Sequence, residues 1–177
     1  MLLTKAGAKN WTHRETAAYL KKKYKLSLWW QQGVTLGFEI GTGKRIEGQS
    51  LKGDYSITAT RSLPISAVKL WRLVISKPGM QAWLKPLSPF DLEPGAEYEC
   101  EGGIFGQVRT LKAPERVRLS WQDTDWPKPT VISLAFVPRP GEKSIFVIQH
   151  TGLKTAAQRE QMRAHWKAAI ADLAALL

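Results

Sequence analysis

The C-terminal run from Thr155 to Leu177 is the feature that most constrains how this chain can fold. Large apolar side chains recur in it at helical spacing, at Met162, Trp166, Ile170, Leu173 and Leu177, which is one stripe of a 3.6-residue period. Thr155 and Gln158 have the spacing of a capping box, which predicts where the helix begins. Such a helix is about 33 Å long at roughly 1.5 Å per residue. It therefore needs a large apolar surface to lie on.

A series of strand patterns can supply that surface. Residues 55–63 alternate Tyr55, Ile57 and Ala59 with Ser and Thr, which is typical of a half-buried strand. Two helical patterns follow, one in ISAVKLWRLVIS and a shorter one in PGMQAWL, and then a Pro-containing loop. Five further strand patterns come at about ten-residue spacing between turn signals. These lie in residues 97–101, 104–113, 116–122, 130–138 and 144–153.

The order of these elements predicts the fold class. Strands joined by short turns are antiparallel neighbours, and a sheet of this kind buries one of its faces. The C-terminal helix is the element long enough to cover that face. The sequence therefore predicts an α+β fold, in which a curved antiparallel sheet of about six strands wraps around the long helix. We assign this domain to residues 54–177.

Residues 1–53 predict a basic helical module that ends in a linker. We expect its helices to be too small to bury much core alone and to pack against the domain that follows. Thr12 and Glu15 form a second capping box, and the helix that follows ends in a cluster of lysines, Lys21, Lys22, Lys23 and Lys25. Residues 28–40 predict another helix, which Gly33 and Gly37 weaken. The glycine-rich residues 41–54 are typical of a connector, and their GTGKR stretch lacks the spacing of a phosphate-binding loop.

Charge and cysteine content limit the class of protein. The net charge is +11, and residues 1–53 contribute +7 of it from ten Lys or Arg and three Glu. Any argument for an acidic partner therefore starts at the front of the chain. A single cysteine excludes an intrachain disulfide and fits a reducing compartment. The sequence contains neither a signal-peptide pattern nor a long apolar run, so we expect a cytoplasmic protein that does not insert into a membrane.

Several stretches resemble a known superfamily. ISAVKLWRLVISKPGMQAWL, LKAPERVRLSW, the strand ending in IQHTGL and the terminal AHWKAAIADLAALL are similar to the helix-grip superfamily of START, polyketide-cyclase and Bet v 1-like domains. More narrowly, residues 54–177 resemble the bacterial branch named after homologues of a heat-shock chaperone ATPase activator. His165 stands where that branch usually has Gly. Residues 1–53 resemble a small helical module found ahead of such domains in some bacterial proteins.

The resemblance implies a cavity between the sheet and the C-terminal helix that holds an apolar small molecule or lies near a protein partner. Strand phase and helix spacing select the side chains that would line it. The candidates are Trp71, Trp83, Tyr98, Cys100, Val108, Trp121, Phe136, Phe146, Ile148, His150, Met162 and Trp166, together with Leu119. The competing interpretation is that these residues fill an ordinary core, since large aromatic rings close cavities as readily as they line them.

His150 continues the phase of Phe146 and Ile148, which places an imidazole on an apolar face. The plainer interpretation is a buried histidine with a hydrogen-bond partner. Two other interpretations give His150 a functional role, either as a polar anchor for a ligand or as a general base in a cyclase- or hydrolase-like enzyme. No catalytic residue, metal site or cofactor is predicted: the three histidines lack ligand spacing, Glu97, Glu99 and Glu101 point to solvent, and Cys100 is expected to be an inert core thiol. We therefore expect binding rather than catalysis.

Nucleic-acid binding is the alternative that the pattern favours less. Lys21–Lys25 beside Trp29 and Trp30 combine phosphate-neutralising charge with rings on which bases can stack. The competing interpretation is a solvated helix end, with both tryptophans buried against the main domain.

Overall fold

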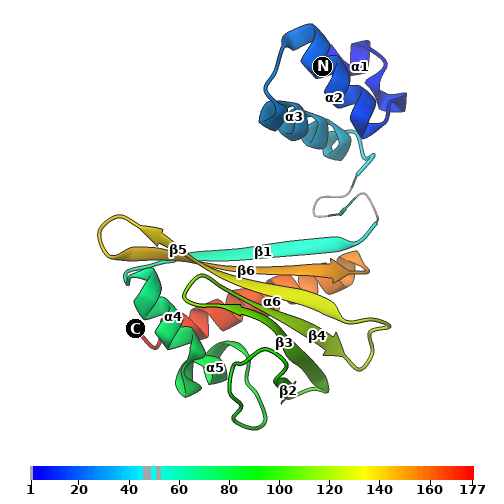
Figure 1. The fold of residues 1–177 in the computed structure, drawn as a ribbon. Helices are drawn as coiled ribbons and strands as arrows, with labels where there is room; N and C mark the ends of the chain where they lie inside the picture. Colours follow the sequence, from blue (N-terminus) through cyan, green and yellow to red (C-terminus); the bar gives the residue numbers. More distant parts are fainter. Residues whose placement is uncertain (1, 46–48, 51–52) are drawn as a thin grey trace. The chain divides into compact units, whose positions relative to one another are not determined.

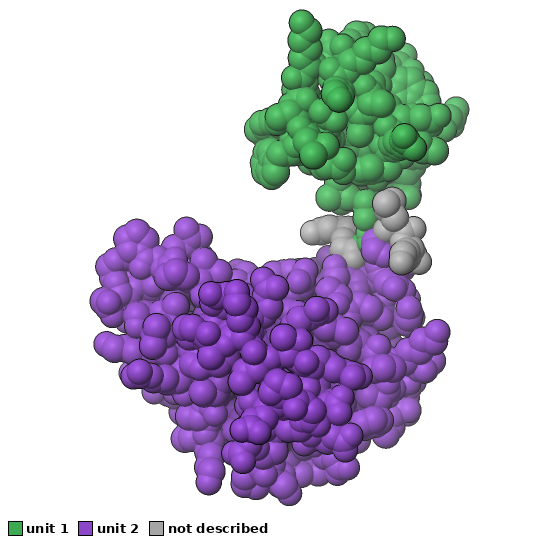
Figure 2. All heavy atoms as spheres, viewed as in Figure 1, with its two compact units in different colours: residues 1–49 green, residues 50–177 purple. Residues whose placement is uncertain are grey.

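A computed structural model describes residues 2–45, 49–50 and 53–177. The chain divides into two compact units, residues 1–49 and residues 50–177, which Figure 2 shows in different colours. Each unit has a hydrophobic core of its own. The predicted connector at 41–54 includes residues 46–48 and 51–52, which lie outside the described residues.

The C-terminal unit contains the predicted α+β fold. Its sheet has six antiparallel strands in the order β1-β6-β5-β4-β3-β2 (Figure 1). They are β1 (Tyr55–Leu63), β2 (Glu97–Cys100), β3 (Ile104–Lys112), β4 (Arg116–Asp123), β5 (Thr130–Arg139) and β6 (Lys143–Leu153). All six strand predictions are confirmed. Alternating apolar side chains and flanking turn residues marked each strand in the sequence.

Three helices cover one face of the sheet. They are α4 (Ala67–Ile75), α5 (Lys77–Trp83) and the long α6 (Ala156–Ala174), which lies along the curved sheet in Figure 1. Thr155 and Gln158 form the predicted capping box at the start of α6. The helix ends earlier than predicted, at Ala174, and Leu177 is 52% exposed. The rest of the predicted stripe is buried, namely Met162, Trp166, Ile170 and Leu173.

The strand register explains why the inner face of the sheet is apolar. One row across four strands joins Ile57, His150, Ile132 and Leu119. The adjacent inward row joins Ala59, Ile148, Leu134 and Val117. Because side chains alternate along a strand, every member of these rows points to the same face. The register thus places His150 among aliphatic neighbours, as its phase predicted.

The N-terminal unit is a small helical bundle. It contains α1 (Leu2–Lys5), a 3-10 turn η1 (Ala8–Asn10), α2 (His13–Tyr24) and α3 (Leu28–Gly41). Leu3, Ala8, Leu20 and Phe38 form its buried core. The capping box of Thr12 and Glu15 and both longer helices are as predicted, whereas α1 and η1 are too short to have shown a period. In the described parts of the chain, no helix combines the length and apolar character of a membrane span.

Replacing Gly33 or Gly37 with alanine should stabilise the N-terminal unit. Both glycines lie inside α3, and a Cβ at either position would meet no atom within 4 Å. Alanine loses less backbone entropy in a helix than glycine does, so each change should add about 0.5–1 kcal/mol to the free energy of unfolding. Thermal and urea unfolding of the full chain would measure the gain. A loss of stability in either variant would show that the space around that glycine is not open.

Candidate functional site

The predicted site residues all lie in the interior of the C-terminal unit. Trp71 comes from α4, Trp83 from α5, Met162 and Trp166 from α6, and the others from the inner face of the sheet. The apolar ones and Cys100 belong to one hydrophobic cluster, and His150 has no exposed surface. Sheet and helices therefore bring the candidates together. They meet as buried side chains of one hydrophobic cluster.

His150 holds the centre of this interior through two hydrogen bonds. The indole N–H of Trp166 on α6 donates to His150 Nδ1 at 3.0 Å. On the other side of the ring, His150 Nε2 lies 2.7 Å from Thr130 Oγ1 at the start of β5. Thr130 Oγ1 in turn donates to the backbone carbonyl of Trp121 on β4, at 2.9 Å. The chain of bonds ties α6 to three strands.

These bonds define the protonation state of His150. Because Nδ1 accepts from an indole, the ring proton sits on Nε2 and is donated to Thr130. Burial, followed by the nearby His165, lowers the pKa of His150 to about 3, so the ring is neutral near pH 7. Both nitrogens are occupied. A general base needs a free lone pair within reach of substrate, and His150 offers none in this arrangement.

Aromatic rings enclose the histidine. Trp166, Trp121 and Trp126 have ring centroids 5.8, 6.0 and 6.1 Å from that of His150. His165 extends this aromatic cluster along α6, with its ring centroid 4.6 Å from Trp166 and 5.4 Å from Trp121. Burial and the charge of Lys85 lower the pKa of His165. A second imidazole therefore lies beside the first, and it is also held in its neutral form.

Two polar atoms in the aromatic cluster have no hydrogen-bond partner among the described residues. They are Trp121 Nε1, which can only donate, and His165 Nε2. Both atoms are buried, and leaving a buried polar group unpaired costs roughly 1–3 kcal/mol. Such atoms are rare in folded proteins and call for an explanation, of which a bound molecule is one. The sequence pointed to Trp121 by its phase, but it gave no sign that the indole N–H lacks an acceptor.

The remaining candidates have ordinary core environments. Trp71, Phe136 and Phe146 pack ring against ring, with centroids 5.1 and 5.5 Å apart. The indole N–H of Trp83 donates to the carbonyl of Val74 at 3.0 Å. Burial raises the pKa of the Cys100 thiol to about 12, which leaves it unreactive as a nucleophile. Within the described ranges, no group of three or more His, Cys, Asp or Glu is placed to hold a metal ion.

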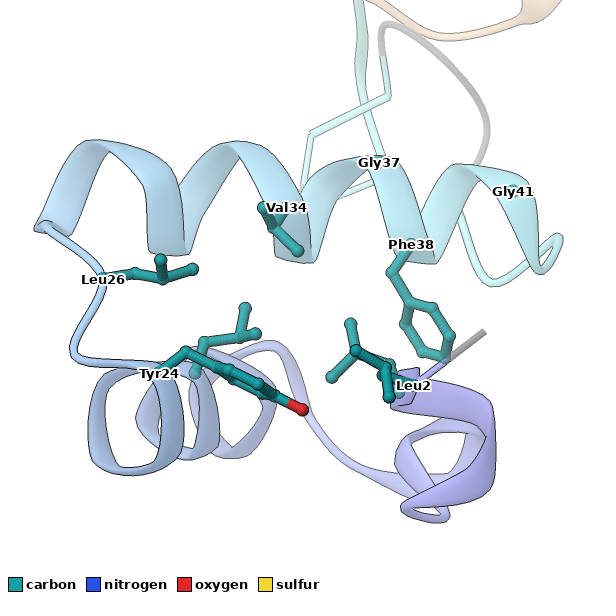
Figure 3. Close-up of a pocket in the computed structure, with 9 residues that line it drawn as sticks. Leu2, Tyr24, Leu26, Val34, Gly37, Phe38 and Gly41 are labelled. Carbon is teal, nitrogen blue, oxygen red and sulfur yellow. The ribbon is translucent and has the colours of Figure 1, made fainter.

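The N-terminal unit contains an apolar groove that the sequence did not predict. It has a volume of about 450 Å³ and is lined by Leu2, Leu3, Leu20, Tyr24, Leu26, Val34, Gly37, Phe38 and Gly41. Figure 3 shows Val34 and Phe38 reaching down from α3 toward Leu2 and Tyr24. The lining comes from three helices and a turn. No single stretch of sequence could reveal it, because α1 was not recognised as an element.

The N-terminal unit also exposes two tryptophan side chains. Trp29 and Trp30, at the start of α3, are 72% and 56% exposed and contact each other edge to face at 4.8 Å. The N-terminal unit therefore does not bury them itself. At the start of α2, His13 hydrogen-bonds Gln32 and Glu39 on α3, and these bonds raise the pKa of His13.

Comparison with protein families identifies the C-terminal unit. The family described as activator of Hsp90 ATPase homolog 1-like protein matches residues 64–177, more than half of the chain. The chain belongs to this family. The resemblance predicted from the sequence is thus confirmed for the activator of Hsp90 ATPase homolog 1-like domain. A search of curated protein sequences gave no match.

Solved structures agree with the family at the level of the fold. CalU16 from Micromonospora echinospora has a TM-score of 0.60 at 16% identity, over 71% of this chain and 78% of its own. PFC0360w, an Hsp90 activator from Plasmodium falciparum, has a TM-score of 0.59 at 14% identity, over 68% of this chain and 94% of its own. Protein CV1439 from Chromobacterium violaceum gives 0.57 at 20% identity, over 68% and 96%. At these identities the likeness concerns the fold alone.

Proposed function

We propose that the C-terminal unit binds a neutral, largely apolar small molecule between the sheet and α6, without catalysing a reaction on it. The observation that carries the proposal is the pair of buried, unpaired atoms Trp121 Nε1 and His165 Nε2. Membership of a family with the helix-grip fold supports the location. We also propose a cytoplasmic location, which the single unpaired cysteine supports.

The hydrogen bonds of His150 favour binding over catalysis. Both ring nitrogens are engaged within the protein, and burial keeps the ring neutral. An enzyme of the cyclase or hydrolase type that used His150 as a base would first have to break its bond to Trp166. The polar anchor that the sequence assigned to His150 is therefore better assigned to Trp121 and His165.

The two unpaired atoms indicate what the ligand should carry. An indole N–H needs an acceptor, and a neutral imidazole nitrogen can accept or donate. A hydroxyl group can pair with either atom, and a carbonyl can pair with the indole. A carboxylate fits less well, because its charge would be desolvated beside two neutral imidazoles. The expected ligand is an apolar body with one hydroxyl or carbonyl group.

A matched aromatic series tests this proposal. We expect 2-naphthol to raise the Tm of the C-terminal unit and to bind about tenfold more tightly than naphthalene, as one or two added hydrogen bonds would give. We expect 2-naphthoate to bind more weakly than 2-naphthol. Isothermal calorimetry and thermal unfolding of the full chain would measure both.

Variants of α6 provide the control. His165→Leu should reduce the preference for 2-naphthol over naphthalene, because only Trp121 Nε1 remains to pair with the hydroxyl group, while Gln161→Leu, on the exposed side of the same helix, should keep it. If no compound in the series changes the Tm, or if His165→Leu leaves the preference intact, the proposed site is wrong.

A further inference from the structure

The apolar groove of the N-terminal unit has the properties of a protein-docking site. It lies entirely within residues 2–41 and shares no residue with the site proposed in the C-terminal unit. We propose that this groove docks an acidic amphipathic α-helix of a partner protein. Three observations carry the inference: the shape of the apolar stripe, the cations at its edge, and the pairing of the nearby acidic side chains.

The apolar stripe has the dimensions of a helix-binding groove. Val34, Gly37 and Gly41 line the groove from α3, and Trp30 falls on the same face, one turn before Val34. From Trp30 to Gly41 the stripe runs about 16 Å along α3 at roughly 1.5 Å per residue. A partner helix can bury apolar residues at positions i, i+4 and i+7 along such a length. Gly37 and Gly41 leave room for its side chains, since a Cβ there would meet nothing within 4 Å.

Lysines border this stripe. Lys21 directly follows the lining residue Leu20 on α2, and Lys23 and Lys25 stand on either side of Tyr24 in the sequence. Lys5 ends α1, two residues after Leu3. The Lys23 ammonium group lies 5.9 Å from the ring centre of Tyr24, which lines the groove. A partner seated on the apolar stripe would therefore meet positive charge at its flanks.

The acidic side chains described in this unit are already paired. Glu15 accepts hydrogen bonds from Thr12 in the capping box of α2. Glu39 lies 3.0 Å from His13 Nδ1 and 3.6 Å from Arg45. Neither carboxylate is bonded to the lysines beside the groove. Charge complementarity thus favours a partner whose polar face is acidic.

The groove suits a helix better than other occupants. Tyr24 carries the one polar side-chain group among its lining residues, so a small molecule would find few groups to orient it. Leu3, Leu20 and Phe38 are at most 7% exposed, and this recessed floor suits an inserted side chain better than a flat bilayer. Nucleic-acid bases would find stacking rings at Trp29 and Trp30, whereas the groove itself is mostly aliphatic.

The glycines of α3 allow a selective test. Gly37→Leu places a side chain in the groove, and Gly33→Leu places the same side chain on the same helix outside the lining residues. Both variants keep a helix-compatible backbone with open space, so both should fold. The probe is a fluorescein-labelled helical peptide of about four turns, with leucines on one face at the i, i+4, i+7 spacing and glutamates elsewhere.

We expect the full-length protein to bind this peptide in fluorescence anisotropy. Gly37→Leu should weaken binding at least tenfold, and Gly33→Leu should leave it unchanged. Reversing Lys21, Lys23 and Lys25 to Glu should also weaken binding tenfold or more. The same three-charge reversal at Lys128, Lys143 and Lys167, in the C-terminal unit, is the matched control and should have little effect.

Three outcomes would overturn the inference. The first is equal binding by Gly37→Leu and Gly33→Leu. The second is equal binding of a peptide in which lysines replace the glutamates. The third is that phosphatidylglycerol vesicles or a single-stranded oligonucleotide bind more tightly than the peptide and are affected by Gly37→Leu, which would assign the groove to a membrane surface or to nucleic acid.

Discussion

Replacing His150 with phenylalanine should destabilise the C-terminal unit at pH 7 and stabilise it at acidic pH. At neutral pH the change leaves the buried N–H of Trp166 without its acceptor. An unpaired buried donor costs roughly 1–3 kcal/mol, so we expect a loss of about 2 kcal/mol. Thr130 keeps its bond to the Trp121 carbonyl and adds little to this loss.

The acidic half of the prediction follows from the lowered pKa of His150. The unfolded chain binds a proton near pH 6.5, whereas the folded protein resists protonation until about pH 3. The contribution of the neutral histidine to stability is therefore complete above pH 6.5 and is lost as pH falls toward 3. That loss is on the order of 4 kcal/mol. Phenylalanine does not titrate, so the variant does not lose this stability at low pH.

The two stability curves should therefore cross, at about pH 5 if the neutral-pH loss is about 2 kcal/mol. Urea unfolding followed by near-ultraviolet circular dichroism, at constant ionic strength and several pH values, would locate the crossing. His165 and the carboxylates titrate in both proteins, so the difference between the curves isolates His150. Parallel curves down to pH 3 would show that the folded protein does not hold this ring neutral.

Replacing Gly106 with alanine should destabilise the sheet by about 3 kcal/mol or more. The side chain of Tyr98 on β2 crosses β3 at Gly106, and its hydroxyl donates to the Ser120 carbonyl on β4 at 2.7 Å. A Cβ at position 106 would lie 2.1 Å from that carbonyl oxygen and 2.7 Å from the Tyr98 hydroxyl. Two strands and a buried hydrogen bond would have to shift.

Tyr98→Phe separates the two contributions. It removes the hydroxyl without adding volume, so we expect a loss of about 1–2 kcal/mol. Because the alanine and the hydroxyl compete for one space, the double variant should lose less than the two single changes combined. Urea unfolding would give all three values. A loss below about 1 kcal/mol for Gly106→Ala would mean that Tyr98 does not pass this close to β3.

The fold was largely predictable because its signals are local. Alternation marks each strand of the sheet, and the spacing of Met162, Trp166 and Ile170 marks α6. The predictions failed where local signals are weak. No Gly or Pro follows Ala174 to mark the end of α6 in the sequence. Helix α1, at four residues, is shorter than two helical turns and so shows no period.

The site was predictable only in part, for a related reason. Strand phase placed His150 on the inner face, but its partners Thr130 and Trp166 depend on strand register and on how α6 lies across the sheet. Gly106 looked like any glycine in a strand, because the side chain that crosses it comes from β2. Whether aromatic residues line a space or fill it depends on rotamers and packing, which phase does not determine.

The bonds through His150 run in one direction: the Trp166 indole donates to the histidine, the histidine to Thr130, and the threonine to a backbone carbonyl. Replacing one of these three residues alone leaves a neighbour without its hydrogen-bond partner. Each single variant is therefore destabilised even where a triple variant would not be. Replacing all three with apolar residues of similar volume could be neutral or favourable. We therefore expect the three positions to covary among homologous sequences, and a redesign of this interior should change them together.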